Sequence, residues 1–428
     1  MSCNVNVRAA HNVAHVVTST YDAIPEHLSL TNVVVIHRHG DRSQISREIG
    51  PNFPETSDIK EIWTSKLPVD TTMMTMAAAA HVPTDVLSLN VEKAIYTGWD
   101  EKNIPYGQLT ELGAHQLMNI GRELRRRYVG SLLPLESFDA STLLYCRSTN
   151  FCRTIQSIRS LLSGLLKVDG DDYSSMRSSQ QLPVILSRAK KDETMFPGAD
   201  GPCSAMTERR AKIFAESLME SSIPNYSELE QKMRDVLGYG DRVSWLPIKE
   251  ILTCYEAHGI KFPEGAKRSC VQSAPMNFCT TNVHLVCLGI TDSDADRVTD
   301  LAGWMWGTMY NDDALNRLAI GRFLRELLDV VHSAVFNLPT PPPSSSFSFL
   351  PSTPPRTSSL ELEEHAKMMI FSGHDSTLVP VLCALGIYDG KNSSLICPMQ
   401  SHYPLRHYEQ IFRRCVAPLR ILLKHRNC

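Results

Sequence analysis

The sequence contains no apolar run that approaches the roughly 18 residues of a membrane-spanning helix, so we expect no transmembrane segment. An excess of one charge is also missing, because 43 Lys and Arg residues are balanced by 46 Asp and Glu residues. That balance excludes a broad cationic surface, and with it non-specific binding to nucleic acid. The start, MSCNVNVRAAHNVAHVVTST, lacks the uninterrupted apolar core of a secretory signal. We therefore expect an intracellular protein, cytoplasmic in the first place and mitochondrial as the alternative.

The 428 residues suffice for two or three domains, or for one large domain with an insertion. A chain of this length can bury a sizeable core without disulfides or a structural metal. The hydrophobic content of 43% excludes disorder throughout the chain. We expect the twelve cysteines to be mostly reduced and buried, because no signal directs the chain to an oxidising compartment.

Three short apolar runs each lead directly into polar and charged residues. They are VVVI at 33–36 before HRHGDR, LLYC at 143–146 before RST, and MMIF at 368–371 before SGHD. Continuous apolar runs of this length are typical of strands buried on both faces, as in a parallel sheet. Helical spacing of apolar residues precedes and follows the second run, in 117–128 and 155–165. The alternation predicts an α/β fold with a mainly parallel sheet flanked by helices.

The remaining residues divide by composition into a helical stretch and a segment rich in Pro and Ser. A Pro/Ser-rich segment cannot form a packed element and is interpreted as a loop. We therefore expect an N-terminal extension (1–30), a first part of the α/β core (31–175), an inserted helical lid (176–337), the Pro/Ser-rich loop (338–360) and a second part of the core (361–428).

The first apolar run ends in residues suited to phosphate chemistry. Arg38 and Arg42 carry planar guanidiniums that match phosphate oxygens, and His39 between them can attack phosphorus when its ring is neutral. Gly40 permits the tight turn that would aim the ring. The simpler structural interpretation is an Arg-rich strand end paired with Asp41, and a single short motif does not exclude it.

The other two runs end in residues that would complete such a site. Arg147 adds a third guanidinium, whereas we interpret Arg153, one turn into the following helix, as structural. His374 offers a hydrogen-bond donor for a phosphate oxygen, and Asp375 offers a carboxylic acid for the leaving group. Because ligands of parallel α/β sheets bind beyond the carboxyl ends of the strands, we expect all three motifs at one edge.

Other catalytic designs fit the sequence less well. Cys203 and Arg209 have the spacing of a cysteine-based phosphatase, but no buried strand precedes them and no glycine lies between them. His37 and His39 share a zinc-like spacing without a third ligand motif. The dispersed Asp, His and Asn clusters of a two-metal phosphatase are also missing. We therefore expect neither a metal nor another cofactor.

The motifs, in this order, resemble the histidine acid phosphatases, which form branch 2 of the histidine phosphatase superfamily. The resemblance rests on VVVIHRHGDRS, GQLTELGAHQLMNIGRELRRRYV, YCRSTNFCRTIQSIRSLLSGL and FSGHDSTLVPVLCALGIYDG. The residues around 150–151 and 385–387 are most similar to the lysophosphatidic acid phosphatase branch.

This resemblance implies a phosphoglycerate-mutase-like fold with an inserted lid. It also implies hydrolysis of small phosphomonoesters at acidic pH without a metal, with a lysophospholipid as one candidate substrate. The site residues follow from the same resemblance. His39 would be phosphorylated, Asp375 would protonate the leaving oxygen, and the phosphoryl oxygens would be held by Arg38, Arg42, Arg147 and His374.

Two departures from the family pattern bear on activity. Gln44 stands where the family has Pro, which we expect to make the loop after the first motif less rigid. After Gly390 an edge hairpin of the family is missing, and a helix-like stretch lies near 408–412. His258, in a segment similar to the family's lid, is interpreted as structural or as lining the substrate entrance. A phosphatase is the leading hypothesis, and the alternatives are a phosphomutase with the same site or a catalytically impaired binder of phosphate ligands.

Overall fold

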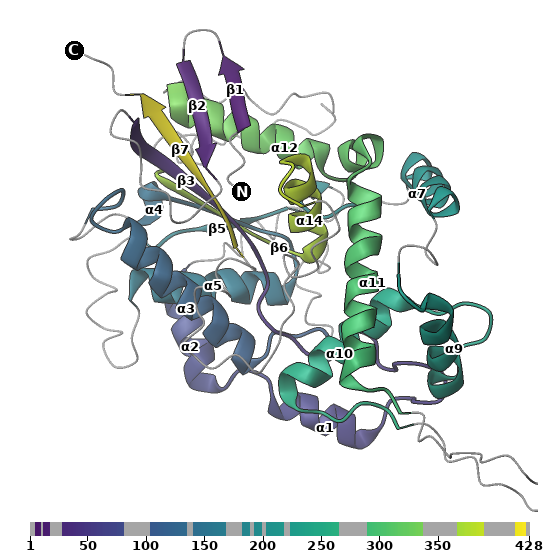
Figure 1. The fold of residues 1–428 in the computed structure, drawn as a ribbon. Helices are drawn as coiled ribbons and strands as arrows, with labels where there is room; N and C mark the ends of the chain where they lie inside the picture. The colour runs from purple at the N-terminus through teal and green to yellow at the C-terminus, as the bar shows by residue number, and fades with distance from the viewer. Residues whose placement is uncertain are drawn as a thin grey trace, which may run out of the picture.

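The computed structural model describes residues 5–9, 12–17, 28–80, 103–134, 140–167, 182–188, 192–198, 203–217, 223–264, 289–336, 366–388 and 416–424. The Pro/Ser-rich segment 338–360 and the helix-like stretch near 408–412 lie outside the described residues. The described chain forms a seven-stranded sheet with helices on both faces and a further group of helices beside it (Figure 1).

Four parallel strands form the centre of the sheet. In spatial order they are β3 (Leu28–Arg38), β6 (Met368–Gly373), β4 (Leu144–Ser148) and β5 (Ile185–Ser187). The three apolar runs predicted from the sequence fall in β3, β4 and β6, where their side chains are buried. The prediction of an α/β fold with a mainly parallel sheet flanked by helices is therefore confirmed.

Three antiparallel strands extend the sheet beyond β3. They are β7 (Val416–Lys424), β2 (Asn12–Val17) and β1 (Val5–Ala9), so that the full order is β1-β2-β7-β3-β6-β4-β5. β7 pairs with β3 from Leu28 to His37. The family hairpin that is missing after Gly390 put folding and activity in doubt, and in the structure β7 and the β1–β2 hairpin extend the sheet on this side of β3. The main-chain groups of β3 thus have partners on both sides.

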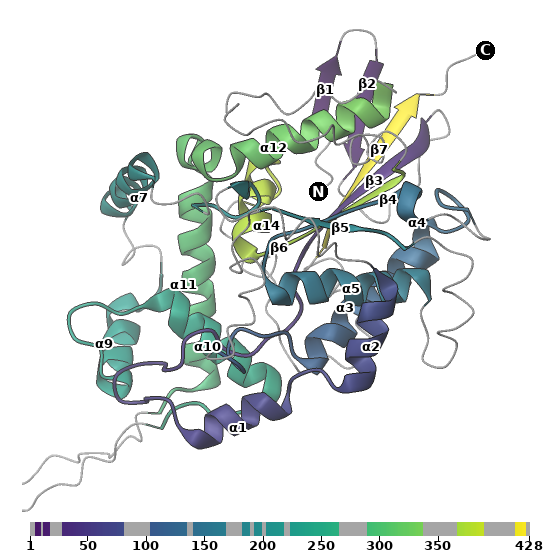
Figure 2. The ribbon, with the colours of Figure 1, turned by 180° about the vertical axis from the view of Figure 1, so that it is seen from behind.

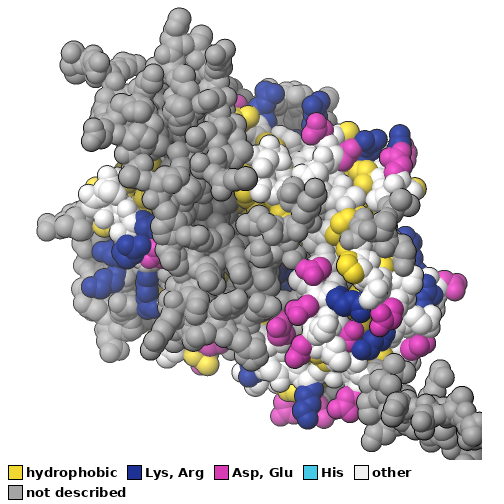
Figure 3. Space-filling model, in the orientation of Figure 1, with side chains coloured by type: hydrophobic (Ala, Val, Ile, Leu, Met, Phe, Trp, Pro, Cys, Tyr) yellow, Lys and Arg dark blue, Asp and Glu magenta, His cyan; other side chains and the backbone are white. Residues whose placement is uncertain are grey.

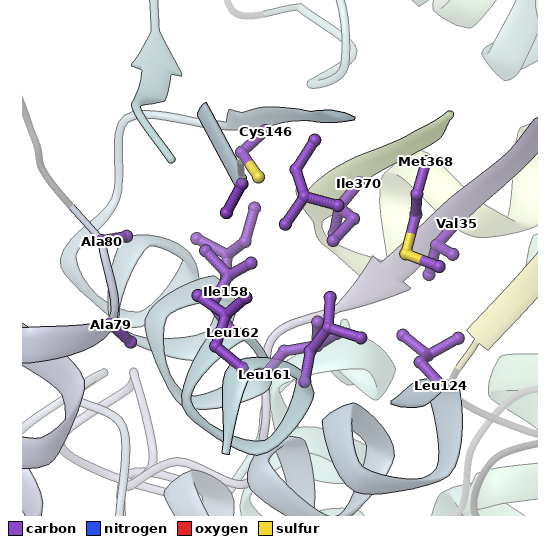
Figure 4. Packing of buried hydrophobic residues seen from close by; sticks show 14 of the residues in the cluster. Val35, Ala79, Ala80, Leu124, Cys146, Ile158, Leu161, Leu162, Met368 and Ile370 are labelled. Carbon is purple, nitrogen blue, oxygen red and sulfur yellow. The ribbon is translucent and has the colours of Figure 1, made fainter. Parts of the chain in front are cut away.

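One face of the sheet is covered by α2 (Asp70–Ala79), α3 (Glu111–Tyr128) and α5 (Cys152–Leu166), and the short α4 (Ala140–Leu143) leads into β4. The buried cluster between these helices and the strands includes Val35, Leu124, Cys146, Ile158, Leu162 and Ile370 (Figure 4). α3 and α5 meet at Gly121 and Gly164, where an added Cβ would lie 1.9 Å from a backbone oxygen of the other helix. Any side chain there would force the two helices apart.

The opposite face of the sheet is covered by α12 (Asp313–Phe336) and α14 (Asp375–Ala384). Val34 and Ile36, which alternate with the residues of the first cluster, pack here with Phe323. α14 begins directly after β6 and therefore places its first turn at the carboxyl edge of the sheet.

A helical lobe lies at this edge, seen from opposite sides in Figures 1 and 2. Its helices are α1 (Ser57–Ser65), α7 (Ser204–Glu216), α9 (Tyr226–Leu237), α10 (Trp245–His258) and α11 (Asp292–Tyr310). Trp63 of α1 is buried in the lobe with Leu237 and Ile248. The lobe therefore combines four helices of the predicted lid (176–337) with α1, which comes from the first part of the predicted core.

The described part of the face in Figure 3 is mixed in charge. Figure 3 shows Lys and Arg side chains intermingled with Asp and Glu side chains on the face that it presents. No helix in the described residues combines the length and the hydrophobicity that a membrane span requires. The five cysteines within the described ranges are free thiols.

Candidate active site

The loop after β3 fixes the ring of His39. The amide of His39 donates to the carbonyl of Gly373, at the end of β6, over 3.0 Å. The next residue, Gly40, lies so close to α3 that an added Cβ would be 2.4 Å from the carbonyl oxygen of Gly113. Nδ1 of His39 lies 2.8 Å from the carbonyl oxygen of Gly40, which can only accept, so this nitrogen carries the ring proton. Nε2 therefore carries the free lone pair.

The imidazoles of His39 and His374 are buried side by side, with 5.5 Å between their ring centroids. Burial lowers the pKa of His39 well below its ordinary value, and the neighbouring charges of Arg38, Arg153 and Arg42 lower it further. The pKa of His374 is lowered well below its ordinary value by burial and by the same three cations. Both rings are therefore neutral, which a nitrogen nucleophile requires.

His374 is held from three directions. Its amide donates to Oγ1 of Thr377 over 3.0 Å, and its Nε2 lies 3.0 Å from Oγ1 of Thr149. The rings of Phe151 and Phe196 pack edge-on against the imidazole, with centroids 4.8 and 5.1 Å away. The orientation of His374 thus depends on residues from the loop between β4 and α5, from α14 and from the segment around Phe196.

Asp375 follows at the first position of α14 and faces Arg38, with 2.5 Å between Oδ1 and Nε. Burial alone would raise the pKa of this carboxyl, but the charges of Arg38, Lys249 and Arg42 outweigh it and hold the pKa below its ordinary value. Asp375 is therefore ionised in the free protein. Lys249 comes from α10 of the lobe, and burial lowers its own pKa.

Two further guanidiniums stand beside the histidines. Arg42 forms an ion pair with Glu250, which raises the pKa of Arg42 against the opposing effect of burial. Arg153 lies over the ring of Phe151, 4.7 Å from its centroid, with Nη2 3.5 Å from Nδ1 of His374. Burial next to Arg42 and Arg38 lowers the pKa of Arg153 to about 9. Cations that destabilise one another in this way favour the binding of an anion.

The structure corrects the expected position of Arg147. Tyr145, two residues earlier on β4, packs against Phe371 on the side of the sheet that α12 covers, and Arg147 points to the same side because strand side chains alternate. Its guanidinium is bound there by Glu193 and Glu326. The third guanidinium beside the histidines is instead that of Arg153, which we had interpreted as structural.

The position of Arg153 could have been read from the sequence. In a strand–loop–helix unit, the N-terminal turn of the helix lies at the same edge as the carboxyl end of the strand. Arg153 is the second residue of α5 and therefore lies at the strand ends.

The lobe holds the loop after β3 through α10. His258 Nε2 lies 2.6 Å from Oδ2 of Asp41, and Glu250 accepts from the amide of Ile45 over 2.8 Å as well as from Arg42. His258 is thus bound to the loop beside the site, which agrees with its structural interpretation. Sequence reasoning missed Glu250 and Lys249, because no local pattern shows which turn of a lid helix faces the sheet edge.

Gln44 also stabilises this loop. Its Nε2 donates to the carbonyl of Ser46 over 2.8 Å and to that of Arg47 over 3.2 Å, and its Oε1 accepts from Nε1 of Trp63 over 3.0 Å. We expected a less rigid loop where the family has Pro. These hydrogen bonds compensate for the missing ring by tying the turn to α1.

Arg38, His39, Arg42, Arg153, His374 and Asp375 together form what we call the His39 cluster. It combines a neutral nucleophile with three cations and one carboxyl group at the carboxyl edge of the sheet, which suits a phosphoryl group. The cysteine alternative does not fit the structure, because Arg209 of α7 is paired with Asp312, which precedes α12, and not with an anion site near Cys203. Within the described ranges, no group of three or more His, Cys, Asp and Glu side chains could hold a metal ion.

Comparison with known proteins finds relatives at low identity. Counting factor 60 of Dictyostelium discoideum is 25% identical over 368 residues, which are 84% of this chain and 73% of that protein. Lysophosphatidic acid phosphatase type 6 of Bos taurus is 24% identical over 376 residues, which are 85% of this chain and 71% of that protein. The solved structure of Hafnia alvei phytase in complex with tartrate superposes with a TM-score of 0.48 at 14% identity, covering 85% of this chain and 76% of that one.

The expected cytoplasmic location is wrong. Lysosomal acid phosphatase of Xenopus laevis is 21% identical over 421 residues, which are 97% of this chain and 74% of that protein, and lysosomal acid phosphatase of Bos taurus also matches. Both of these relatives are named as lysosomal proteins. The expectation rested only on the absence of an apolar leader, and an absence does not determine a compartment.

The family model described as histidine phosphatase superfamily (branch 2) matches residues 29–238, from β3 through the end of α9. This range contains Arg38 at the end of β3, His39 and Arg42 on the loop after it, and Arg153. The relatives reported above include proteins named acid phosphatases. These matches assign residues 29–238 of the chain to the histidine phosphatase superfamily, branch 2.

Proposed function

We propose that this chain hydrolyses phosphomonoesters through a phosphohistidine on His39. The main support is the state of that ring, which is neutral and has Nδ1 bound to the carbonyl of Gly40. In the described part of the chain, Nε2 has no hydrogen-bond partner and is surrounded by cations. Such a nitrogen can attack the phosphorus of a bound phosphomonoester in line with the leaving oxygen.

The reaction takes two steps. In the first, Nε2 of His39 forms a bond to phosphorus while the bond from phosphorus to the ester oxygen breaks, and Asp375 gives its proton to that oxygen. In the second, water attacks the phosphorus, Asp375 takes a proton from the water, and the bond between phosphorus and Nε2 breaks. Arg38, Arg42 and Arg153 stabilise the charge on the phosphoryl oxygens in both steps.

The Arg38–Asp375 pair explains how the carboxyl group would gain its proton. In the free protein, Arg38 and Arg42 lower the pKa of Asp375. A phosphate dianion that accepts hydrogen bonds from these guanidiniums would offset their charge. The pKa of Asp375 then rises when substrate binds, so that a protonated acid is present at acidic pH, as the family resemblance leads us to expect.

We propose lysophosphatidic acid as the candidate substrate to test first. The relatives include proteins named lysophosphatidic acid phosphatase type 6. Phe151 and Phe196 add half-buried aromatic surface beside His374, which suits an apolar leaving group. A site for an inositol polyphosphate would need several further cations near the cluster to bind the other phosphate groups. Hydrolysis of 1-oleoyl lysophosphatidic acid and of inositol hexakisphosphate should be compared at equal enzyme concentration, and faster turnover of the second would refute this choice.

Trapping the phosphoenzyme tests the reaction itself. Wild type is mixed with a radiolabelled phosphomonoester and quenched in alkaline detergent, because phosphohistidine hydrolyses in acid. We expect label on wild type and none on His39→Ala. His115→Ala is the matched control, because that side chain is exposed on α3 and outside the cluster. Folded wild type that releases phosphate without ever carrying label would refute the proposal.

The products separate the phosphatase from its alternatives. Free inorganic phosphate without transfer to an added acceptor alcohol excludes a phosphomutase. Tight binding of phosphate without turnover of any phosphomonoester would identify an inactive binder instead.

A further inference from the structure

Arg147 lies in a network of buried charges behind the His39 cluster. Its side chain is 2% exposed, and its Nη2 donates to Oε1 of Glu193 over 2.9 Å and to Oγ1 of Thr194 over 2.8 Å. Nη1 donates to Oε2 of Glu326 on α12 over 2.5 Å. Both Nη atoms of this guanidinium are thus bound by acidic and hydroxyl partners within the protein, which holds the side chain away from the His39 cluster.

The network fixes the backbone of 193–195. Oε1 of Glu193 accepts from the amides of Thr194 and Met195 over 2.8 and 2.7 Å, in addition to Arg147. Arg322 of α12 donates to the carbonyl of Glu193 over 3.2 Å. One buried carboxylate thus holds three consecutive residues against β4 and α12.

The same segment reaches the catalytic residues on its other side. The hydroxyl of Thr377 donates to the carbonyl of Met195 over 2.6 Å. The same hydroxyl oxygen, Oγ1, accepts from the amide of His374 over 3.0 Å. The ring of Phe196 packs on the imidazole of His374. The segment therefore contacts the first turn of α14 next to Asp375, through one hydrogen-bond chain and one aromatic contact.

We propose that Arg147 is a positioning residue for the proton donor and does not contact the phosphoryl group. Together with Glu193 it fixes 193–196, and that segment sets where Asp375 points at the start of α14. This inference rests on the proposed function, because it assigns Asp375 the protonation of the leaving oxygen. It predicts that weakening the hydrogen bonds of Arg147 slows proton transfer to the leaving oxygen and leaves phosphate binding unchanged.

The leaving group tests this directly. A nitrophenolate leaves with little help from an acid, whereas the alkoxide of an alkyl phosphate needs a proton. General acid catalysis contributes about 10²–10⁴-fold, so partial misplacement of the acid should cost roughly 10-fold on the alkyl ester. For Arg147→Lys we expect kcat/KM to fall about 10-fold on glycerol phosphate and less than about 2-fold on 4-nitrophenyl phosphate, with an unchanged inhibition constant for inorganic phosphate.

Three further variants complete the experiment. Asp375→Asn removes the acid itself and should give the largest difference between the losses of kcat/KM on the two substrates. Thr377→Val breaks the whole hydrogen-bond chain from Met195 to the His374 amide without burying an unpaired charge, and should show the same split if Arg147→Lys fails to fold. Arg188→Lys is the matched control, because Arg188 pairs with Glu326 from the solvent side and interacts with Glu193 only through its charge, which Lys keeps. We expect Arg188→Lys to leave the ratio of the two kcat/KM values unchanged.

Each other outcome contradicts the inference. An equal loss on both substrates with weaker phosphate inhibition would make Arg147 a phosphate ligand. An equal loss with unchanged phosphate inhibition would reduce it to a purely structural residue. Failure of the proposed function is a separate result, because wild type itself would then carry no phosphate on His39.

Discussion

Replacing Arg153 with Met should remove one of the three cations that we assign to the phosphoryl oxygens. The Arg153 guanidinium lies 3.5 Å from His374 and over Phe151, and its pKa is lowered to about 9 by burial and by Arg42 and Arg38. At acidic and neutral pH it is therefore charged. Met keeps much of the length and the contact with the aromatic ring but removes the charge and the donors.

The size of the effect follows from charge-assisted hydrogen bonds. A bond to a charged group is worth about 1.5–3 kcal/mol, which corresponds to roughly 10–100-fold in the inhibition constant of inorganic phosphate. Removing one donor to the transition state costs about 10²–10³-fold in rate. We expect kcat/KM of Arg153→Met on 4-nitrophenyl phosphate to fall by about that factor, whereas Arg147→Lys leaves it nearly unchanged.

The pH profile gives a second, independent test of the same variant. The charge of Arg153 lowers the pKa of both His39 and His374. Without it both pKa values rise, so the rings become protonated at a higher pH as acid is added. The acid limb of kcat/KM should therefore move to higher pH.

Arg126→Met is the control, because that side chain is 70% exposed on α3 and pairs with Glu123 on its own helix, away from the cluster. If Arg153→Met binds inorganic phosphate within about 2-fold of wild type, Arg153 does not hold the phosphoryl group and the cluster is assigned wrongly.

Three more substitutions test other parts of the account. Gly121→Ala places a Cβ 1.9 Å from the carbonyl oxygen of Leu161 and should lower the free energy of unfolding by about 1–3 kcal/mol, visible as a lower Tm. Burial lowers the pKa of His37 from 6.5 to about 4. Between these two pH values His37 is protonated in the unfolded chain but neutral in the folded chain, so acid favours unfolding. About 3 kcal/mol of stability is lost across that window, and His37→Leu should flatten this part of the pH dependence of urea unfolding; an unchanged slope would contradict it. Glu250→Gln removes the carboxylate that competes with phosphate for Arg42, so the inhibition constant of phosphate should fall by about 5-fold, or about 1 kcal/mol, and a rise would show that Glu250 mainly positions the guanidinium.

The parallel centre of the sheet could be predicted from the sequence because each of its long strands is a continuous apolar run. The runs at 33–36 and 368–371 become adjacent strands in register, which brings Arg38 opposite Gly373 and places His39 beside His374. Topology alone therefore brought the two histidines together. β7 was not predicted, because its apolar pattern does not show which edge it joins.

Side-chain direction could not be predicted in the same way. The place of Arg153 in the first turn of α5 could be inferred, but whether Arg147 points to the cluster depends on which face of β4 its side chain occupies. Buried acidic partners on distant segments, Glu193 and Glu326, are what hold Arg147 on the far side. No local pattern reveals such long-range pairing.

The position of the phosphoryl group on the protein tests the central claim most directly. Trapped phosphoenzyme is hydrolysed in alkali, and the phosphohistidine isomers are separated and assigned by ³¹P NMR, with the modified peptide identified by mass spectrometry. Because Nδ1 of His39 is bound to the carbonyl of Gly40, the account predicts phosphate on Nε2 of His39, as 3-phosphohistidine. Phosphate on Nδ1, on another residue, or on no residue of an active enzyme would contradict it.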